Sequence, residues 1–172
     1  MSTTPTGRHE RRDTGDVVAF TRTFRAPIDD VWAAVTESDR LARWIGTWTG
    51  NPADGFVTFE MNAEEEPMPP ARYDVRECVP PHRLVVYSVD DFGSWLLTVD
   101  LSETDGVTTL VLGQVIDDPA MIENTGPGWE YYLDRLVAAE TGADPDAIDF
   151  DDYYPAQREH YLAITRAVTG TS

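Results

Sequence analysis

Lysine is absent from this sequence, and basic residues of any kind are scarce. Its 172 residues include 13 basic side chains, all of them arginine, against 31 acidic ones, for a formal net charge of −18. Without lysine, Schiff-base and other lysine-based mechanisms are excluded. Nucleic acids and anionic membranes are bound by basic side chains that neutralise phosphates. The charge therefore disfavours both as partners.

Cysteine is almost as rare, because Cys78 is the single example. One thiol excludes an intramolecular disulfide and a zinc site built from several thiolates. No apolar run reaches the length of a membrane span, and residues 1–15 lack the hydrophobic region of a secretory signal. We therefore expect a cytoplasmic protein with no membrane partner.

Recognisable catalytic and cofactor motifs are missing as well. The three histidines form no His-Glu-x-x-His pattern, no serine lies in a Gly-x-Ser-x-Gly elbow, and no glycine-rich phosphate loop occurs. The acidic clusters at residues 64–66 and 149–152 lack the spacing of a calcium loop. We predict no cofactor, no metal site and no catalytic residues, which disfavours an enzyme without excluding one.

The residues that are present suit one folded domain. Hydrophobic residues make up 41% of the chain and charged residues 26%, and a chain of this length can bury a full core. We predict a disordered tail over residues 1–15, where little can be buried, and the domain itself over residues 16–142. Residues 143–172 form a C-terminal extension whose helix is expected to pack on the domain.

The first half of the domain carries one strand signal and two helix signals. Alternating side chains predict a strand over residues 17–24. Pro27 suits the start of a helix, and the apolar spacing that follows predicts that helix over residues 28–35. A second short helix is expected between Ser38, which can cap it, and Gly46, which can end it.

The second half begins with strands and ends with helices. Five β-rich runs separated by short turns lie at residues 55–62, 72–79, 84–90, 94–102 and 107–116. Short links favour antiparallel neighbours, so we predict an α+β fold with an antiparallel sheet. Gly126-Pro127-Gly128 should break any earlier helix, leaving a helix over residues 129–142 and a last helix after Pro155.

Several segments in this order resemble one known superfamily. They are FRAPIDDVWAAVTESDRLARWIG, YDVRECVPPHRLVVYS, LLTVDLSETDGVTTLVL and GWEYYLDRL. Together they resemble the START-like, or SRPBCC, superfamily, and within it the bacterial proteins related to the C-terminal domain of the heat-shock-protein-90 ATPase activator. The resemblance covers residues 17–140 and implies a helix-grip fold. In that fold a curved antiparallel sheet wraps around a long C-terminal helix and encloses a cavity that opens near two short helices.

Aromatic residues recur on the predicted strands and on the long helix. In a helix-grip fold many of them could line one pocket, although strand and helix aromatics more often simply fill a core. Gln114 joins them because it is a polar side chain on an otherwise apolar strand face. The predicted ligand-binding residues are Trp44, Trp48, Phe59, Tyr73, Tyr87, Trp95, Gln114, Trp129 and Tyr132.

The leading functional hypothesis is the binding of a small apolar or aromatic molecule in an internal cavity. The alternative is an enzyme resembling polyketide cyclases or dehydratases, with Gln114, Tyr87 and Glu77 as candidate proton carriers. A third hypothesis is a co-chaperone-like interaction module, although the sequence has no counterpart of the additional N-terminal domain of the eukaryotic activators. Relatives of this fold have several functions, so the fold does not choose among these. Both a monomer and a homodimer are compatible with the sequence.

Overall fold

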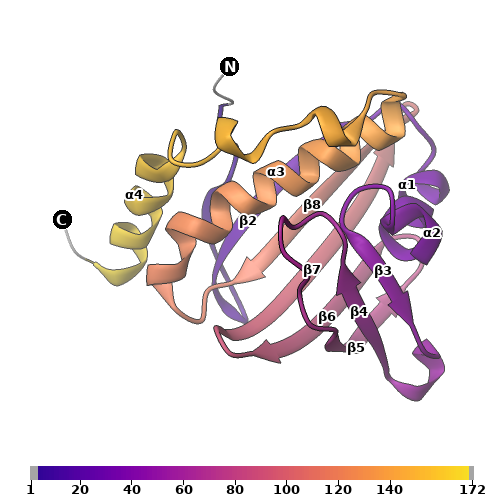
Figure 1. Cartoon of the computed structure of the whole chain (residues 1–172), viewed down its shortest axis with the longest axis horizontal. Coiled ribbons are helices and arrows are strands. Elements are labelled where there is room, and N and C mark those ends of the chain that lie inside the picture. Colours follow the sequence, from indigo (N-terminus) through magenta and orange to yellow (C-terminus); the bar gives the residue numbers. More distant parts are fainter. Residues whose placement is uncertain (1–3, 171–172) are drawn as a thin grey trace.

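An eight-stranded antiparallel sheet forms the body of the molecule in the computed structural model, which describes residues 4–170 (Figure 1). The strands are β1 (Arg8–Arg12), β2 (Gly15–Phe24), β3 (Gly46–Thr49), β4 (Phe56–Met61), β5 (Ala71–Val79), β6 (Arg83–Asp90), β7 (Gly93–Thr104) and β8 (Val107–Val115). Their order in the sheet is β1-β2-β8-β7-β6-β5-β4-β3. Every neighbouring pair is antiparallel, as the short links between the strands predict.

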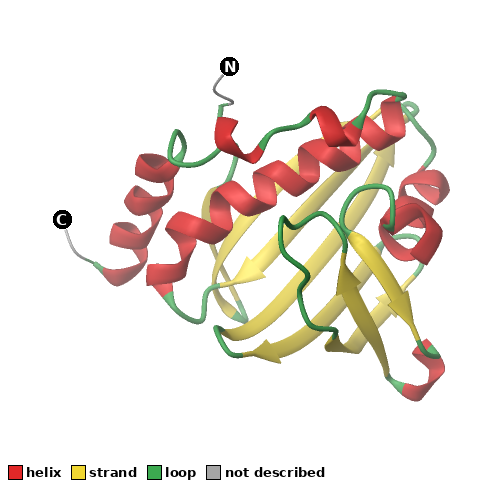
Figure 2. Cartoon of the chain, in the orientation of Figure 1, coloured by secondary structure: helices red, strands yellow, loops and turns green. Residues whose placement is uncertain are grey.

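The helices lie on one side of this sheet (Figure 2). They are α1 (Ile28–Thr36), α2 (Ser38–Leu41), α3 (Ile122–Thr141) and α4 (Arg158–Thr169), and short 3-10 turns lie at Pro52–Asp54, Pro119–Met121, Pro145–Ala147 and Phe150–Asp152. The long helix α3 crosses the sheet, with α1 and α2 near its C-terminal end and α4 beside its N-terminal half (Figure 1). This arrangement confirms the predicted α+β, helix-grip fold.

The core lies between α3 and the sheet, and strand alternation explains its composition. On β7 and β8 every second side chain faces α3, and the register places Val99 opposite Leu112 and Leu101 opposite Leu110. These apolar cross-strand pairs stabilise the sheet and form a surface on which Leu136 of α3 is fully buried.

The N-terminal segment differs from the predicted disordered tail. Residues 8–12 form β1, which pairs with the start of β2 from Arg8 opposite Ala19 to Arg12 opposite Gly15. Ladder hydrogen bonds hold this strand, together with side-chain hydrogen bonds to β2 from Arg8 to Thr21 and between His9 and Asp16, rather than burial of apolar side chains. Composition therefore gave no sign of it. Residues 1–3 of the expected tail lie outside the described residues.

The second short helix ends earlier than expected. Gly46 was predicted to terminate it, but α2 ends at Leu41 and Gly46 is instead the first residue of β3. Glycine is required there because a Cβ would overlap the carbonyl oxygen of Glu60 on the neighbouring strand. The close backbone approach pairs β3 with β4.

The predicted break at Gly126-Pro127-Gly128 does not occur. Helix α3 runs through these residues, and the buried ring of Pro127 removes one backbone donor without ending the helix. The contact at Gly126 explains why the helix tolerates these residues. The ring of Tyr161 from α4 packs directly on the Cα of Gly126, where a Cβ would overlap the ring. Docking of α4 thus offsets the poor helix propensity of this stretch.

Candidate functional site

A cavity of about 400 Å³ lies between the sheet and the helices. Strands β4 to β8 form its floor, and α1, α2 and α3 cover it. Its walls are mainly aliphatic and aromatic side chains, including Leu97, Val99 and Leu112 from the sheet and Leu133 from α3. Small-molecule pockets in proteins are concave, mostly apolar and typically roughly 300 to 1,000 Å³ in volume, so this cavity is large enough for a small organic ligand.

Five of the nine predicted pocket residues line this cavity. They are Trp44, Trp48, Phe59, Tyr73 and Trp129. They come from four different parts of the chain, namely the turn after α2, the adjacent strands β3 and β4, strand β5, and helix α3. The other four, Tyr87, Trp95, Gln114 and Tyr132, do not line it.

Tyr87 lies on the opposite face of the sheet. Its neighbour Val86 lines the cavity, so the strict alternation of β6 directs Tyr87 outward. There the guanidinium of Arg76 stacks 3.9 Å from the centre of its ring, a cation–π contact. Tyr87 is therefore a surface-packing residue, and its prediction as a pocket residue is wrong.

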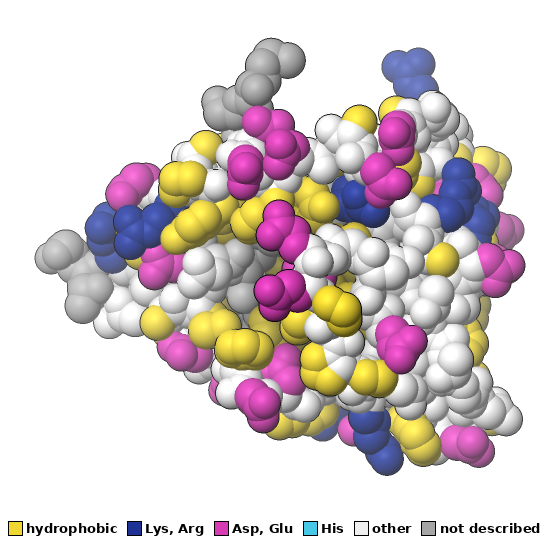
Figure 3. Space-filling model, in the orientation of Figure 1, with side chains coloured by type: hydrophobic (Ala, Val, Ile, Leu, Met, Phe, Trp, Pro, Cys, Tyr) yellow, Lys and Arg dark blue, Asp and Glu magenta, His cyan; other side chains and the backbone are white. Residues whose placement is uncertain are grey.

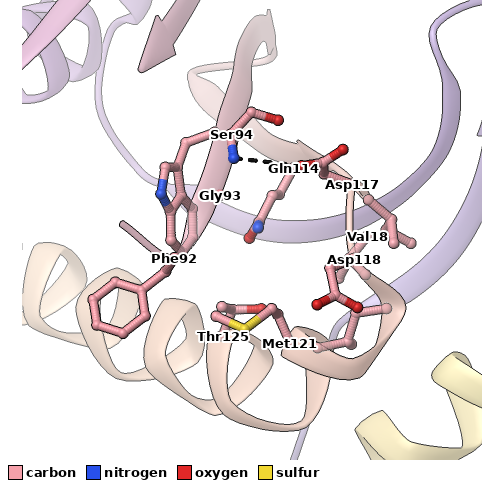
Figure 4. A pocket seen from close by; sticks show the side chains of 12 residues that line it. Val18, Phe92, Gly93, Ser94, Gln114, Asp117, Asp118, Met121 and Thr125 are labelled. Atoms are coloured by element: carbon pink, nitrogen blue, oxygen red, sulfur yellow. Dashed lines mark hydrogen bonds between the residues drawn. The ribbon is translucent and has the colours of Figure 1, made fainter. Parts of the chain in front are cut away.

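Trp95 and Gln114 lie beyond the end of the cavity, beside a much smaller pocket near the start of α3 (Figure 4). The Trp95 indole donates to Asp90 Oδ2 at 2.7 Å. Gln114 Oε1 accepts a hydrogen bond from Trp129 Nε1 at 2.8 Å, which places this pair of side chains between the small pocket and the large cavity. Gln114 thus does not line the cavity itself, but it holds Trp129, which does, in position.

Tyr132 lies on α3 and is buried in the protein core. Its ring packs edge-to-face on Trp129, with ring centroids 6.2 Å apart. Its hydroxyl donates to Glu64 Oε1, which joins the β4–β5 loop to α3. Burial, together with the neighbouring carboxylate of Glu65, raises the pKa of Glu64 above its ordinary value. Tyr132 therefore supports the wall from behind.

Three of the four tryptophans among the described residues that line the cavity have indole N–H groups bonded within the protein, and Trp32 is the fourth. The indole of Trp44 donates to the carbonyl of Ala34 at 3.0 Å, and the indole of Trp48 donates to the carbonyl of Thr36 at 2.8 Å. The indole of Trp129 donates to Gln114 on β8, as described above. Buried indole N–H groups usually find such partners, and here the partners belong to the protein itself. These three residues are left to contact a ligand through their rings.

Tyr73 differs from the tryptophans. Its ring packs edge-to-face on Phe59, with centroids 5.7 Å apart, and its hydroxyl makes no hydrogen bond to any residue in the described range 4–170. Burial, together with the nearby carboxylate of Asp90, raises the pKa of Tyr73 above its ordinary value. The hydroxyl is therefore neutral and able to donate a hydrogen bond.

The opening of the cavity is marked by its exposed wall residues, Glu37, Pro52 and Cys78. Glu37 follows α1, Pro52 lies between β3 and β4, and Cys78 is near the end of β5. The cavity thus opens near the two short helices, where the family resemblance places the opening.

A β-bulge decides which residue of β5 reaches this opening. Simple alternation puts Tyr73, Val75 and Glu77 on one face. The register of β5 against β6 shifts between Val75 and Glu77, so Cys78 lines the cavity instead. Glu77 points away from it and pairs with Arg83 at 3.1 Å on the surface. Cys78 was missed because a bulge has no clear signature in one sequence.

The described residues also bear on metal binding and on the enzyme hypothesis. Within residues 4–170, no three His, Cys, Asp or Glu side chains are grouped so as to hold a metal ion. None of the proposed proton carriers, Gln114, Tyr87 and Glu77, lines the cavity.

Within residues 4–170, no helix is both long enough and apolar enough to cross a membrane.

Comparison with known proteins identifies the family. The family described as Activator of Hsp90 ATPase homolog 1-like protein matches residues 25–140, which is more than half of the chain. The chain belongs to this family. Membership in the Activator of Hsp90 ATPase homolog 1-like family confirms the predicted relation to the START-like, or SRPBCC, superfamily. No curated protein matches the chain.

Solved structures support the same fold. CalU16 from Micromonospora echinospora is 24% identical and superposes with a TM-score of 0.67 in its crystal structure, over 99% of this chain and 98% of that chain. A protein from Bordetella parapertussis is 23% identical, with a TM-score of 0.70 over 92% and 90% of the two chains. DynU16, a protein in the dynemicin biosynthetic locus, is 22% identical over 75% of this chain and 49% of its own, with a TM-score of 0.63. At these identities the likeness extends to the fold alone.

Proposed function

We propose that this protein binds a small, largely apolar or aromatic molecule in the cavity beneath α3. The observation that carries the proposal is the cavity itself, which has about 400 Å³ of space, aromatic and aliphatic walls and an opening to solvent. Burying apolar ligand surface there contributes roughly 25 cal/mol per Å². A cavity left empty forgoes the van der Waals contacts that its wall atoms would otherwise make.

The distribution of charge supports the same proposal. No arginine is among the described residues that line the cavity, whereas acidic side chains are spread over the visible surface (Figure 3). The acidity thus belongs to the solvated surface and the binding capacity to the interior. We infer a cytoplasmic binding protein with a ligand-binding domain over residues 16–142 and a docked extension over residues 143–172.

Calorimetric titration with neutral aromatic probes such as 2-ethylnaphthalene tests this proposal. We expect saturable binding of one molecule per chain, and a melting temperature that rises with probe concentration. At a free concentration of 100 times the Kd, the stabilisation is about 2.7 kcal/mol. The similarity to a protein in the dynemicin biosynthetic locus is a reason to add polyketide-like aromatics to the set of compounds.

Two variants on the same strand provide the control. Val86→Trp places an indole in the cavity, while Val89→Trp places it on the outside, where Val89 is 64% exposed. Binding should be lost in the first and kept in the second. Equal binding by both variants, or no binding by the wild type to any aromatic compound, would count against the proposal.

A further inference from the structure

The free polar groups of the cavity define the chemistry of its ligand. We propose that the ligand is electrically neutral and carries a hydrogen-bond acceptor, such as a carbonyl oxygen, that receives a hydrogen bond from Tyr73. This inference rests on the proposed function, because it concerns the same cavity. It assigns the polar recognition of the ligand to one side chain.

Nearly every other donor in the wall is already engaged. The Thr36 hydroxyl donates to the carbonyl of Trp32 at 2.7 Å, and three indole N–H groups are bonded within the protein as described above. Among the described wall residues, the hydroxyl of Tyr73, the indole of Trp32 and the exposed thiol of Cys78, a weak donor, make no hydrogen bond. Trp32 lies on α1, five residues before Glu37 at the opening, and is half-buried.

Tyr73 lies well along β5 from Cys78, one of the wall residues at the opening. It and Cys78 are five residues apart on β5, which corresponds to about 16 Å along a strand. The end of the cavity away from Cys78, where Tyr73 packs on Phe59, is called its inner end. A ligand that enters past Cys78 therefore presents its leading end to the Tyr73 hydroxyl, and the aromatic and aliphatic walls enclose the rest.

The charges around the cavity select against anionic ligands. Asp90 lies close enough to Tyr73 to perturb its ionisation, and Glu37 is at the opening. No arginine or histidine lines the described cavity, so a carboxylate or phosphate at the inner end has no cation to pair with. Burying an unpaired charge is costly, and a second negative charge near Asp90 adds repulsion. A neutral acceptor avoids both penalties.

Three probes of matched size separate these effects. 2-Acetylnaphthalene offers a carbonyl acceptor, 2-ethylnaphthalene replaces it with an apolar group, and 2-naphthoate replaces it with an anion. A neutral hydrogen bond predicts that the wild type binds the ketone about three- to tenfold more tightly than the ethyl compound. The naphthoate should bind most weakly of the three.

Tyr73→Phe is the decisive variant, because it removes the hydroxyl and keeps the ring. The three- to tenfold preference for the ketone should disappear, while the Kd of the ethyl compound stays within about twofold. Tyr87→Phe is the matched control, since Tyr87 lies on the outer face of the sheet. It should keep the wild-type preference.

An infrared measurement on the wild type tests the inference without any variant. The carbonyl stretch of bound 2-acetylnaphthalene should shift to lower frequency than that of the ketone in an apolar solvent. Equal affinity for the ketone and the ethyl compound, an unshifted carbonyl, or a ketone preference that survives Tyr73→Phe overturns this inference while the proposed function stands. Failure of all three probes to bind overturns the proposed function as well.

Discussion

Glu130 shows how one buried side chain can hold distant parts of the chain together. It lies on α3 and is only 1% exposed. Its carboxylate accepts hydrogen bonds from the backbone N–H of Thr6 at 3.0 Å and from the Thr6 hydroxyl at 2.6 Å, and Arg22 lies 3.8 Å away. A buried carboxylate persists only with such partners. The N-terminal segment is therefore anchored to α3 by this residue.

Replacing Glu130 with alanine should destabilise the protein by about 3 kcal/mol, because Thr6 and Arg22 lose a buried partner. Urea unfolding measured by circular dichroism gives the free energy of unfolding. Glu159→Ala, at an exposed glutamate on α4, should change it by less than about 0.5 kcal/mol. Equal losses in the two variants would show that the Glu130 contacts do not contribute to stability.

Three tyrosines with raised pKa values should make the stability of the protein depend on pH in the alkaline range. Burial, together with Asp134, raises the pKa of Tyr153, and burial, together with Glu130, raises that of Tyr161. Burial, together with Asp90, raises the pKa of Tyr73 as well. Because the folded state holds these protons more tightly than the unfolded state, their contribution is complete below about pH 10 and is lost as the pH rises further.

Absorbance at 295 nm during alkaline titration measures this directly. Because the folded state raises their pKa values, Tyr73, Tyr153 and Tyr161 should ionise only in the cooperative unfolding transition. Stability measured by urea unfolding should fall above about pH 10. If all seven tyrosines titrate together while the chain remains folded, the burial described for these hydroxyls is wrong.

At the scale of elements, the contact between α3 and α4 is the least expected part of the fold. Tyr161 of α4 is fully buried and packs on Gly126 of α3. Tyr153, in the segment between the two helices, donates from its hydroxyl to Asp134 Oδ2 at 2.6 Å. The C-terminal extension therefore belongs to the same packed body as the sheet and α3.

Two glycines in α3 give a matched test of this contact. Gly126→Ala should lower the free energy of unfolding by about 1–3 kcal/mol, because the added Cβ overlaps the Tyr161 ring and α4 must shift. Gly128→Ala should raise it by about 0.5–1 kcal/mol, since nothing lies within 4 Å of the added Cβ and alanine favours the helix. Thermal and urea unfolding of both variants measure the difference. The same sign of change in both variants would contradict the packing described.

The sequence predicted those elements whose apolar periodicity is strong. Strands β4 to β8 and helix α1 carry clear patterns, so they were placed within a few residues. The edge strands β1 and β3 were missed because they have only five and four residues and are held mainly by backbone pairing. The start of α3 was misplaced because Gly126-Pro127-Gly128 is tolerated only through the tertiary contact with Tyr161.

The candidate site was predicted in part, for similar reasons. Residues such as Phe59 and Trp129 follow from alternation and helical spacing, and they do line the cavity. Alternation does not state which face of an isolated strand is the inner one, so Tyr87 was assigned to the wrong side. Because of the bulge in β5, the side chain of Cys78 lines the cavity in place of that of Glu77. The free hydroxyl of Tyr73 depends on contacts across several elements, which one sequence does not reveal.

At the scale of the whole molecule, the net charge of −18 is a property of the surface. Acidic side chains are visible across the face in Figure 3, and many of the arginines form ion pairs, including Arg72 with Asp74 and Arg83 with Asp100. Such exposed pairs contribute little individually. The excess of negative charge repels itself in the compact state.

Added salt should therefore stabilise the protein. Raising sodium chloride from about 10 mM to about 500 mM shortens the Debye length and screens the repulsion among the excess carboxylates. The melting temperature measured by scanning calorimetry should rise. A neutral osmolyte at the same osmolarity serves as the control, and a fall in melting temperature with salt would mean that the ion pairs outweigh the repulsion.

The central claim for the whole molecule is that its cavity binds a small neutral molecule. Nuclear Overhauser effects between bound 2-acetylnaphthalene and the methyl groups of the protein locate the ligand most directly. Cross-peaks are predicted to the cavity methyls of Leu97, Val99 and Leu112, and none to the exposed methyls of Val79 and Val89. Cross-peaks to the exposed methyls, with none to the cavity, would contradict the central claim.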